Sequence, residues 1–214
     1  NGAGNRLAVG AAGADGPGDI SSGSGELYLF SFIDANFNGG TSQGKIENDF
    51  TNGVLGTLGD DDRFGSAVSL NGAGDRLAVG ARIGDGQGNS SNRSGEVHLF
   101  SFTDSDFNGG SRDGTIGDGF VGTGDVNISG SLDDDDYFGT SVSLNGAGDR
   151  LAVGAARGDG SGNGSNDSGE VHLFSFTDSD FSGGSLEGTI GDGFSFGKSV
   201  DMSGALDDSD EFGS

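Results

Sequence analysis

The sequence lacks several residue types on which other classes of protein depend. It contains no Cys, no Trp, one Pro and one Met. The absence of Cys excludes disulfide bonds and thiolate metal sites, but it leaves the cellular compartment open. No apolar run has the length of a membrane span, so we expect no membrane insertion. Gly supplies 47 of the 214 residues and hydrophobic residues only 31%, a composition that excludes a helical bundle.

Positive charge is also scarce. Ten Lys and Arg residues stand against 34 Asp and Glu residues, which gives a formal net charge of −24. A chain of this charge repels a phosphate backbone, so nucleic acid is excluded as a partner, and it attracts cations. Most of the acidic residues are Asp, which like Gly favours turns over helices. The composition therefore predicts short strands joined by many turns.

Three sequence patterns recur along the chain. NGAGDRLAVGA occupies residues 71–81 and 145–155, and a near copy opens the chain. SGEVHLFSFTDSDF occupies residues 94–107 and 168–181, with a related copy at 24–37. The dipeptide Phe-Gly follows an acidic run three times, at Phe64, Phe138 and Phe212. These patterns divide the chain into three repeats. They are residues 1–70, which lack a first strand, residues 71–144, and residues 145–214, which run to the start of a further repeat.

Each repeat carries signals for four short strands. One set of four is residues 66–70, at the end of the first repeat, and residues 76–81, 96–102 and 114–120 of the second, with the tight turn NGAGD between the first two. The second strand is rich in Ala and Gly and the third in Phe, a gradient that suits the narrowing centre of a β-propeller. We expect an all-β fold of about three tandem four-stranded antiparallel blades, cut from a longer array.

These patterns together resemble a known repeat. FGTSVSL, RLAVGAA and SGEVHLFSF are similar to the FG-GAP repeat of integrin α-subunit propellers and of many bacterial surface proteins. Phe138-Gly139 corresponds to FG and Gly154-Ala155 to the first two residues of GAP, whereas the third position holds Ala156 instead of Pro. The longer pattern resembles repeats of very large secreted bacterial adhesin-like proteins. The resemblance implies β-propeller blades and an extracellular or cell-surface location.

The calcium site of the family is not carried over by this resemblance. FG-GAP propellers often bind Ca²⁺ in a DxNxDG-type hairpin between the first two strands, but here that hairpin is contracted. Asn71 and Asp75 are its only side chains with oxygens, and Asn145 and Asp149 are their equivalents. Because Ca²⁺ takes six to eight oxygen ligands, this hairpin offers too few.

Two other segments contain candidate Ca²⁺ ligands. One is the Gly-rich loop after RLAVGA, and the other is the acidic run before Phe-Gly. Both have a simpler interpretation, as a solvated loop and a hydrated run of charge. The candidate metal ligands are Asp85, Asn89, Asp159, Asn163 and Asp167 in the loops, and Asp133, Asp134, Asp135 and Asp136 in the run.

Two further sets of residues recur. Phe64, Phe138 and Phe212 hold equivalent positions, so we expect them to anchor neighbouring strands; the alternative is an exposed turn aromatic. His98 and His172 are replaced by Tyr28 in the first repeat, which favours a packing role over a catalytic one. Five Asn-x-Ser sequons are candidate glycosylation sites, although in a bacterial protein the pattern usually has no such meaning. They begin at Asn89, Asn92, Asn127, Asn163 and Asn166.

Three functions are compatible with these features. The first is a non-enzymatic structural and adhesive segment of a giant extracellular protein, which associates with further copies of the repeat and can form a fibre. The second is a propeller that binds surface glycans or proteins with the help of Ca²⁺. The third is a hydrolase, but no catalytic motif is visible, and a catalytic site normally breaks the symmetry of repeats. The near-identity of the repeats favours the first function.

Overall fold

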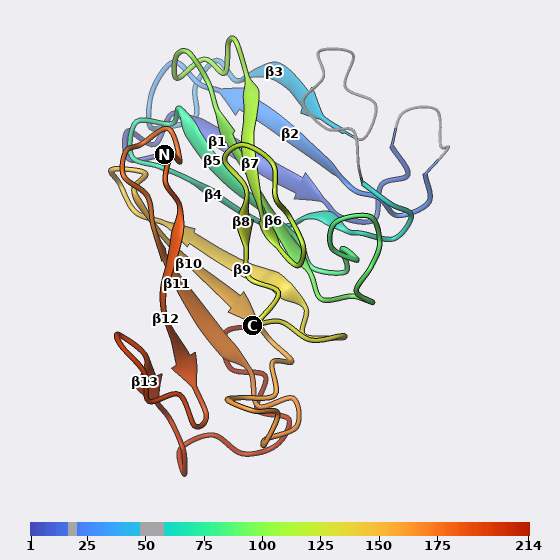
Figure 1. The fold of residues 1–214 in the computed structure, drawn as a ribbon. Coiled ribbons are helices and arrows are strands. Elements are labelled where there is room, and N and C mark those ends of the chain that lie inside the picture. The colour runs from blue at the N-terminus through green and yellow to red at the C-terminus, as the bar shows by residue number, and fades with distance from the viewer. Residues whose placement is uncertain (17–20, 48–57) are drawn as a thin grey trace.

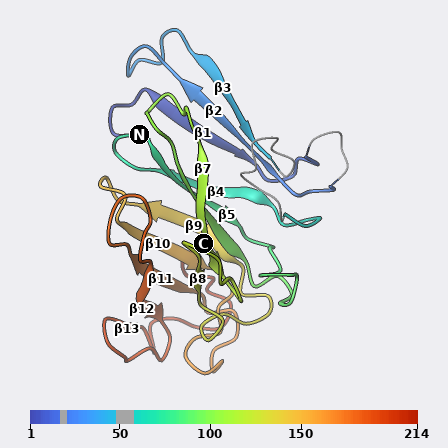
Figure 2. The ribbon, with the colours of Figure 1, turned by 45° about the horizontal axis from the view of Figure 1, so that its top comes forward.

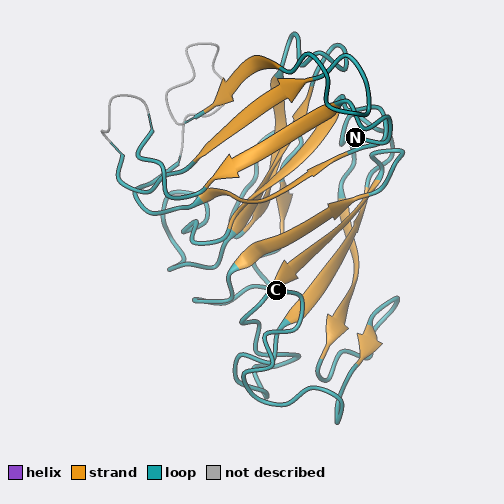
Figure 3. Cartoon of the chain, turned by 180° about the vertical axis from the view of Figure 1, so that it is seen from behind, coloured by secondary structure: helices purple, strands orange, loops and turns teal. Residues whose placement is uncertain are grey.

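The computed structural model describes residues 1–16, 21–47 and 58–214, and these contain strands and loops but no helix (Figures 1 and 3). Accordingly, no described helix could cross a membrane. The strands form three sheets. The first sheet contains β1 (Arg6–Ala11), β2 (Glu26–Ser31) and β3 (Thr41–Ile46). The second contains β4 (Phe64–Leu70), β5 (Arg76–Ala81), β6 (Glu96–Ser101), β7 (Ser111–Gly117) and β8 (Val126–Asn127). The third contains β9 (Phe138–Leu144), β10 (Arg150–Ala155), β11 (Glu170–Ser175), β12 (Ser185–Gly191) and β13 (Val200–Asp201).

Strands that follow one another in the chain pair within each sheet. The four main strands of the second and third sheets are antiparallel, so the predicted fold class is confirmed. The two-residue strands β8 and β13 were not predicted, and each pairs in parallel at the outer edge of its sheet. The sheets are also offset from the sequence repeats, because β4 ends the first repeat but pairs with β5 of the second.

The three sheets pack face to face in chain order (Figure 2). Strand β4 contacts β1, and β9 contacts β4 and β5. The second sheet therefore has two buried faces, each with its own core. Its Leu77, Val79 and Phe100 pack with Leu27 and Leu29 of the first sheet. Its opposite face packs against the third sheet through Val97, Leu99 and Ile116. A closed ring of sheets is not seen in the described part of the chain.

A backbone contact that we call the FG–GA contact recurs between sheets. In it the Gly of Phe-Gly lies against the Gly of RLAVGA in the preceding sheet. A Cβ atom on Gly80 would overlap the carbonyl oxygen of Gly139. Gly139 itself has φ of +87°, a conformation that residues with a side chain rarely adopt. The pairs are Gly10 with Gly65, Gly80 with Gly139, and Gly154 with Gly213. Glycine is thus needed on both sides of each contact.

The Phe of each Phe-Gly pair is held by the same joint. The N–H of Phe138 donates a hydrogen bond of 2.9 Å to the carbonyl of Ser94 in the second sheet, and its side chain is fully buried. The ring lies edge-on to His172, with 5.4 Å between ring centroids. Phe64 has the equivalent contacts, whereas Phe212 makes the backbone bond to Ser168 but is half-buried. Phe64-Gly65 and Phe138-Gly139 therefore each join their own sheet to the preceding one, whereas Phe212-Gly213 lies on the third sheet and belongs to no described sheet of its own.

We predict that Gly80→Ala destabilises the chain by about 1–3 kcal/mol, because the added methyl group must push the second and third sheets apart. The matched control is Gly130→Ala, since no heavy atom lies within 4 Å of a Cβ built at Gly130. Urea unfolding of both variants measures the difference. Equal unfolding midpoints for Gly80→Ala and the control would contradict the FG–GA contact.

Candidate functional site

The hairpins at the family calcium position are closed by their own side chains. The Oδ1 atom of Asn71 accepts hydrogen bonds from the N–H groups of Gly74, Asp75 and Arg76 at 2.8, 3.1 and 3.1 Å. Its Nδ2 donates to the Asp75 carboxylate at 2.9 Å, and Asn145 repeats this arrangement. The hairpin oxygens are therefore used within the turn, and these residues do not fit a Ca²⁺ ion.

The Gly-rich loops are shaped by one carboxylate each. Asp159 accepts the N–H of Asp167 at 2.8 Å, and Asp85 accepts the N–H of Arg93 at the same distance. Asn163 and Asp167 adopt positive φ angles of 56° and 52°, and Asn89 has 55°. Asn, Asp and Gly tolerate this conformation better than other residues do. The alternation of Asp, Asn and Gly in these loops therefore has a direct conformational reason.

The acidic run of residues 133–136 forms the joint between the second and third sheets. Asp134 accepts the N–H of Asn92, and the N–H of Asp135 donates to the Asn92 carbonyl, both at 2.9 Å. The Asp135 carboxylate also pairs with Arg93 at 2.6 Å. Asp136 turns back and accepts the N–H of Asp133 at 2.8 Å. The run therefore divides, with its two middle residues bonded to the preceding sheet.

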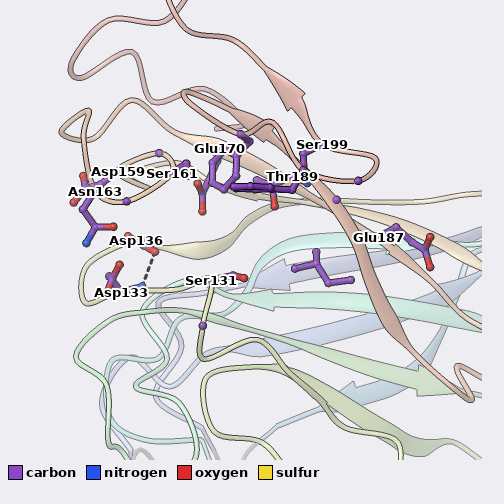
Figure 4. A pocket seen from close by; sticks show the side chains of 18 residues that line it. Ser131, Asp133, Asp136, Asp159, Ser161, Asn163, Glu170, Glu187, Thr189 and Ser199 are labelled. Atoms are coloured by element: carbon purple, nitrogen blue, oxygen red, sulfur yellow. Dashed lines mark hydrogen bonds between the residues drawn. The ribbon is translucent and has the colours of Figure 1, made fainter.

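The two remaining acids of the run line a cavity of about 480 Å³ in the third sheet (Figure 4). Asp159 and Asn163 of the Gly-rich loop line the same cavity, together with Glu170. The aromatic residues Phe194 and Phe196 also line this cavity. The structure thus brings together candidates from both acidic segments. Asp85 and Asn89 lie in the equivalent loop of the second sheet. Asp134, Asp135 and Asp167 line a second cavity beside Arg157, and Asp159 contributes to this cavity as well.

No metal centre is assembled at these positions in the described residues, where no three His, Asp or Glu side chains are grouped closely enough to hold a metal ion. Ca²⁺ binding by the candidate ligands stays a prediction. The five sequon asparagines Asn89, Asn92, Asn127, Asn163 and Asn166 are all exposed. Glycosylation of these residues also stays a prediction.

Burial strongly perturbs one carboxylate at each joint. Only 3% of Asp136 is exposed, and this burial raises its pKa to about 8, with a smaller contribution from the negative charge of Glu170. The N–H of Asp133 opposes the rise. Burial and the charge of Glu96 likewise raise the pKa of Asp62 to about 7. Asp136 is therefore mostly protonated at neutral pH, and Asp62 is about half protonated.

The buried glutamates beside these acids were not predicted from the sequence. Glu170 and Glu96 are nearly fully buried and bond to the Nε2 atoms of His172 and His98 at 2.8 and 2.9 Å. In the first sheet the hydroxyl of Tyr28 donates to Glu26 at 2.5 Å. The pattern Glu-x-His contained the signal, because side chains two residues apart lie on the same face of a strand. The replacement of His by Tyr keeps the bond to the glutamate.

We predict that the free energy of unfolding falls as pH rises from about 4 to 8. The folded chain keeps protons on Asp62 and Asp136 in this window, whereas the unfolded chain, with a carboxyl pKa near 3.8, has lost them. Urea unfolding at pH 5 and pH 8 measures the slope. The double variant Asp62→Asn, Asp136→Asn should flatten it, and the exposed control Asp134→Asn should not. A wild-type chain that is more stable at pH 8 would contradict the burial of these acids.

Comparison with known proteins agrees with the geometry of the joints. Residues 58–100 and 132–174 match the model of the FG-GAP repeat. Each matched segment includes one acidic run, the Phe-Gly pair and the first three strands of a sheet. A search of curated proteins found no match to the chain. Since one match falls on the second sheet and the other on the third, the chain contains two segments that match the FG-GAP repeat.

Proposed function

We propose that the chain is a non-enzymatic structural and adhesive segment of a large extracellular bacterial surface protein. The observation that carries the proposal is the repetition of one interface: the FG–GA contact, the buried Phe and the acidic joint occur in the same form between successive sheets. An interface that each unit presents on both faces permits extension by further units. FG-GAP repeats commonly occur in extracellular proteins and are typically non-enzymatic.

The charge of the chain supports an extracellular role. With a net charge of −24, the folded units repel one another, which keeps them soluble, and salt in the medium screens this repulsion. Many of the acids lie in turns and loops, where they serve as hydrogen-bond acceptors for the backbone, as Asp104 does for Asp106 and Asn108. A surface of this kind suits a coat or spacer in a salt-containing medium.

The test uses intact cells that produce the parent protein. Antibodies raised against residues 1–214 should label these cells without permeabilisation, and proteinase added outside should remove the label. Beads coated with the chain should also adhere to a glycan or protein surface more than beads coated with a Phe64→Ala, Phe138→Ala variant. Labelling that requires permeabilisation would contradict the extracellular role, and equal adherence of both beads would contradict the adhesive role.

The cavity in the third sheet favours one alternative, a Ca²⁺-assisted module for binding glycans or proteins. Asp136, Asp159 and Glu170 offer oxygen atoms that accept hydrogen bonds from the hydroxyl groups of a sugar, and Phe194 offers an apolar wall. Ligand sites combine apolar walls with a few polar groups in this way. Because Asp136 is protonated near neutral pH, a bound Ca²⁺ ion would displace its proton.

We predict for this alternative that Ca²⁺ raises the melting temperature and that a chelator lowers it again, because a ligand that binds only the folded state stabilises that state. Calorimetry from zero to millimolar Ca²⁺ measures the shift. Asp159→Asn should remove it, whereas Asp75→Asn in the contracted hairpin should not. A melting temperature that is independent of Ca²⁺ over this range would sink the calcium-assisted function.

A further inference from the structure

The outer face of the first sheet repeats a face that is buried elsewhere in the molecule. In the second sheet, Leu77 and Val79 of β5 pack toward the first sheet and are 0% exposed. Their equivalents in β1, Leu7 and Val9, are 41% and 42% exposed. Phe37 is 63% exposed, whereas its equivalent in the third sheet is 1% exposed. The first sheet therefore presents to solvent the apolar residues that the other sheets use for packing.

The outer face of the third sheet is the complementary half of the same interface. In the second sheet the residues that face the third sheet are fully buried, namely Ala78, Val97, Leu99 and Ile116. Their equivalents in the third sheet are half-buried, namely Ala152, Val171, Leu173 and Ile190. Val200 is 48% exposed, whereas its equivalent Val126 is 7% exposed. The two ends of the stack thus carry the two halves of an interface already formed twice inside the chain.

Polar groups at the two ends also match. Arg76 of the second sheet reaches across to the third, where it pairs with Asp180 and donates to the Ser179 carbonyl. Arg6 reaches in the same way from the first sheet to Asp106 of the second. Arg150, the equivalent in the third sheet, is 57% exposed and pairs only with its neighbour Asp149 among the described residues. An arginine is therefore placed to reach a turn of a further sheet.

The position of Phe212 also indicates that a further sheet packs on the third sheet. Phe64 and Phe138 are covered by the His and Phe of the sheet that they begin, with Phe138 lying 6.0 Å from the ring of Phe174. Phe212 and Gly213 contact the third sheet in the same way. Phe212 forms a β-bridge with Gly169, and Gly213 makes the FG–GA contact with Gly154. In the first sheet, Tyr28 and Phe30 occupy the positions of those covering rings and are half-buried.

We propose that the outer face of the third sheet binds the outer face of the first sheet of a second copy, head to tail. The proposal deepens the proposed structural role and rests on it. In this arrangement Phe212 lies against Tyr28 and Phe30 of the second copy, and Arg150 reaches the turn that contains Asn36 of that copy. An interface between different faces leaves a free face at each end, so it yields a closed ring or an open filament.

Charge sets the conditions for this association. Two chains of −24 repel each other, and salt screens this repulsion while leaving apolar burial intact. We expect larger assemblies in about 0.5 M NaCl than in about 0.05 M NaCl. Analytical ultracentrifugation of the full chain, up to about 100 μM, measures the distribution of sizes. A monomer at every concentration and both salt levels would overturn the proposal.

Two blocking variants test the head-to-tail geometry. Val9→Asp places a charge on the outer face of the first sheet, and Leu173→Asp places one on the outer face of the third. Each alone should be monomeric, and an equimolar mixture should form a 1:1 dimer and nothing larger, because only one intact pair of faces remains. Circular dichroism must show that both variants are folded. If Leu173→Asp does not fold, Ala152→Glu takes its place, because Ala152 lies on the same outer face. No dimer in the mixture of folded variants would overturn the pairing of these two faces.

The register is tested by strengthening the interface. The first sheet carries Asn36 where the second and third carry Asp106 and Asp180, the partners of Arg6 and Arg76. Asn36→Asp should therefore tighten association about two- to fivefold, as a surface ion pair does. The gain should vanish when Arg150→Ala is also present. An unchanged or weakened association of Asn36→Asp would overturn the register. Since cell-surface labelling does not depend on association of the isolated chain, these results are distinguishable from a failure of the proposed function.

Discussion

The close approach of two glycine backbones is the constraint on which the arrangement of the sheets depends. Gly80 in β5 has no room for a side chain because the Gly139 carbonyl of β9 lies against it, and Gly139 has none because of its positive φ and the nearby Glu96 carbonyl. This approach lets the Phe138 N–H reach the Ser94 carbonyl and places the Phe138 ring in the core between sheets. The spacing between strands of adjacent sheets is thus set by backbone atoms, and apolar side chains fill the space that this spacing leaves.

The positions of the acidic residues 133–136 follow from this contact between the second and third sheets. Because the run of residues 133–136 directly precedes Phe138, its two middle residues lie within hydrogen-bond reach of the loop of the preceding sheet, while Asp136 is drawn into the interior. Burial beside Glu170 then keeps Asp136 protonated near neutral pH. The raised pKa of Asp136 is therefore a by-product of the element that holds two sheets together, and it recurs with the repeat at Asp62.

Much of this was predictable from the sequence, and the exceptions have physical reasons. Strands β4, β5 and β6 follow from alternating apolar residues and from turns rich in Gly and Asn, which act locally. The fourth strand was predicted at residues 114–120, whereas β7 spans Ser111–Gly117. Strand β8 could not be predicted from the sequence, because its two residues form a strand only through parallel pairing with β7. The convergence of Asp136 with Asp159 on one cavity also could not be predicted, since the distance between two loops depends on how β9 and β10 pair.

The most direct test of the account is amide hydrogen exchange at Phe64 and Phe138. Their N–H groups donate to Ser24 and Ser94 of the preceding sheet, both at 2.9 Å. If the FG–GA contact holds the sheets together, these two amides exchange only on global unfolding, with the same free energy as amides in the centre of β5 and β10. Exchange of the Phe64 and Phe138 amides at the rate of exposed loop amides, while the strands remain protected, would contradict the account.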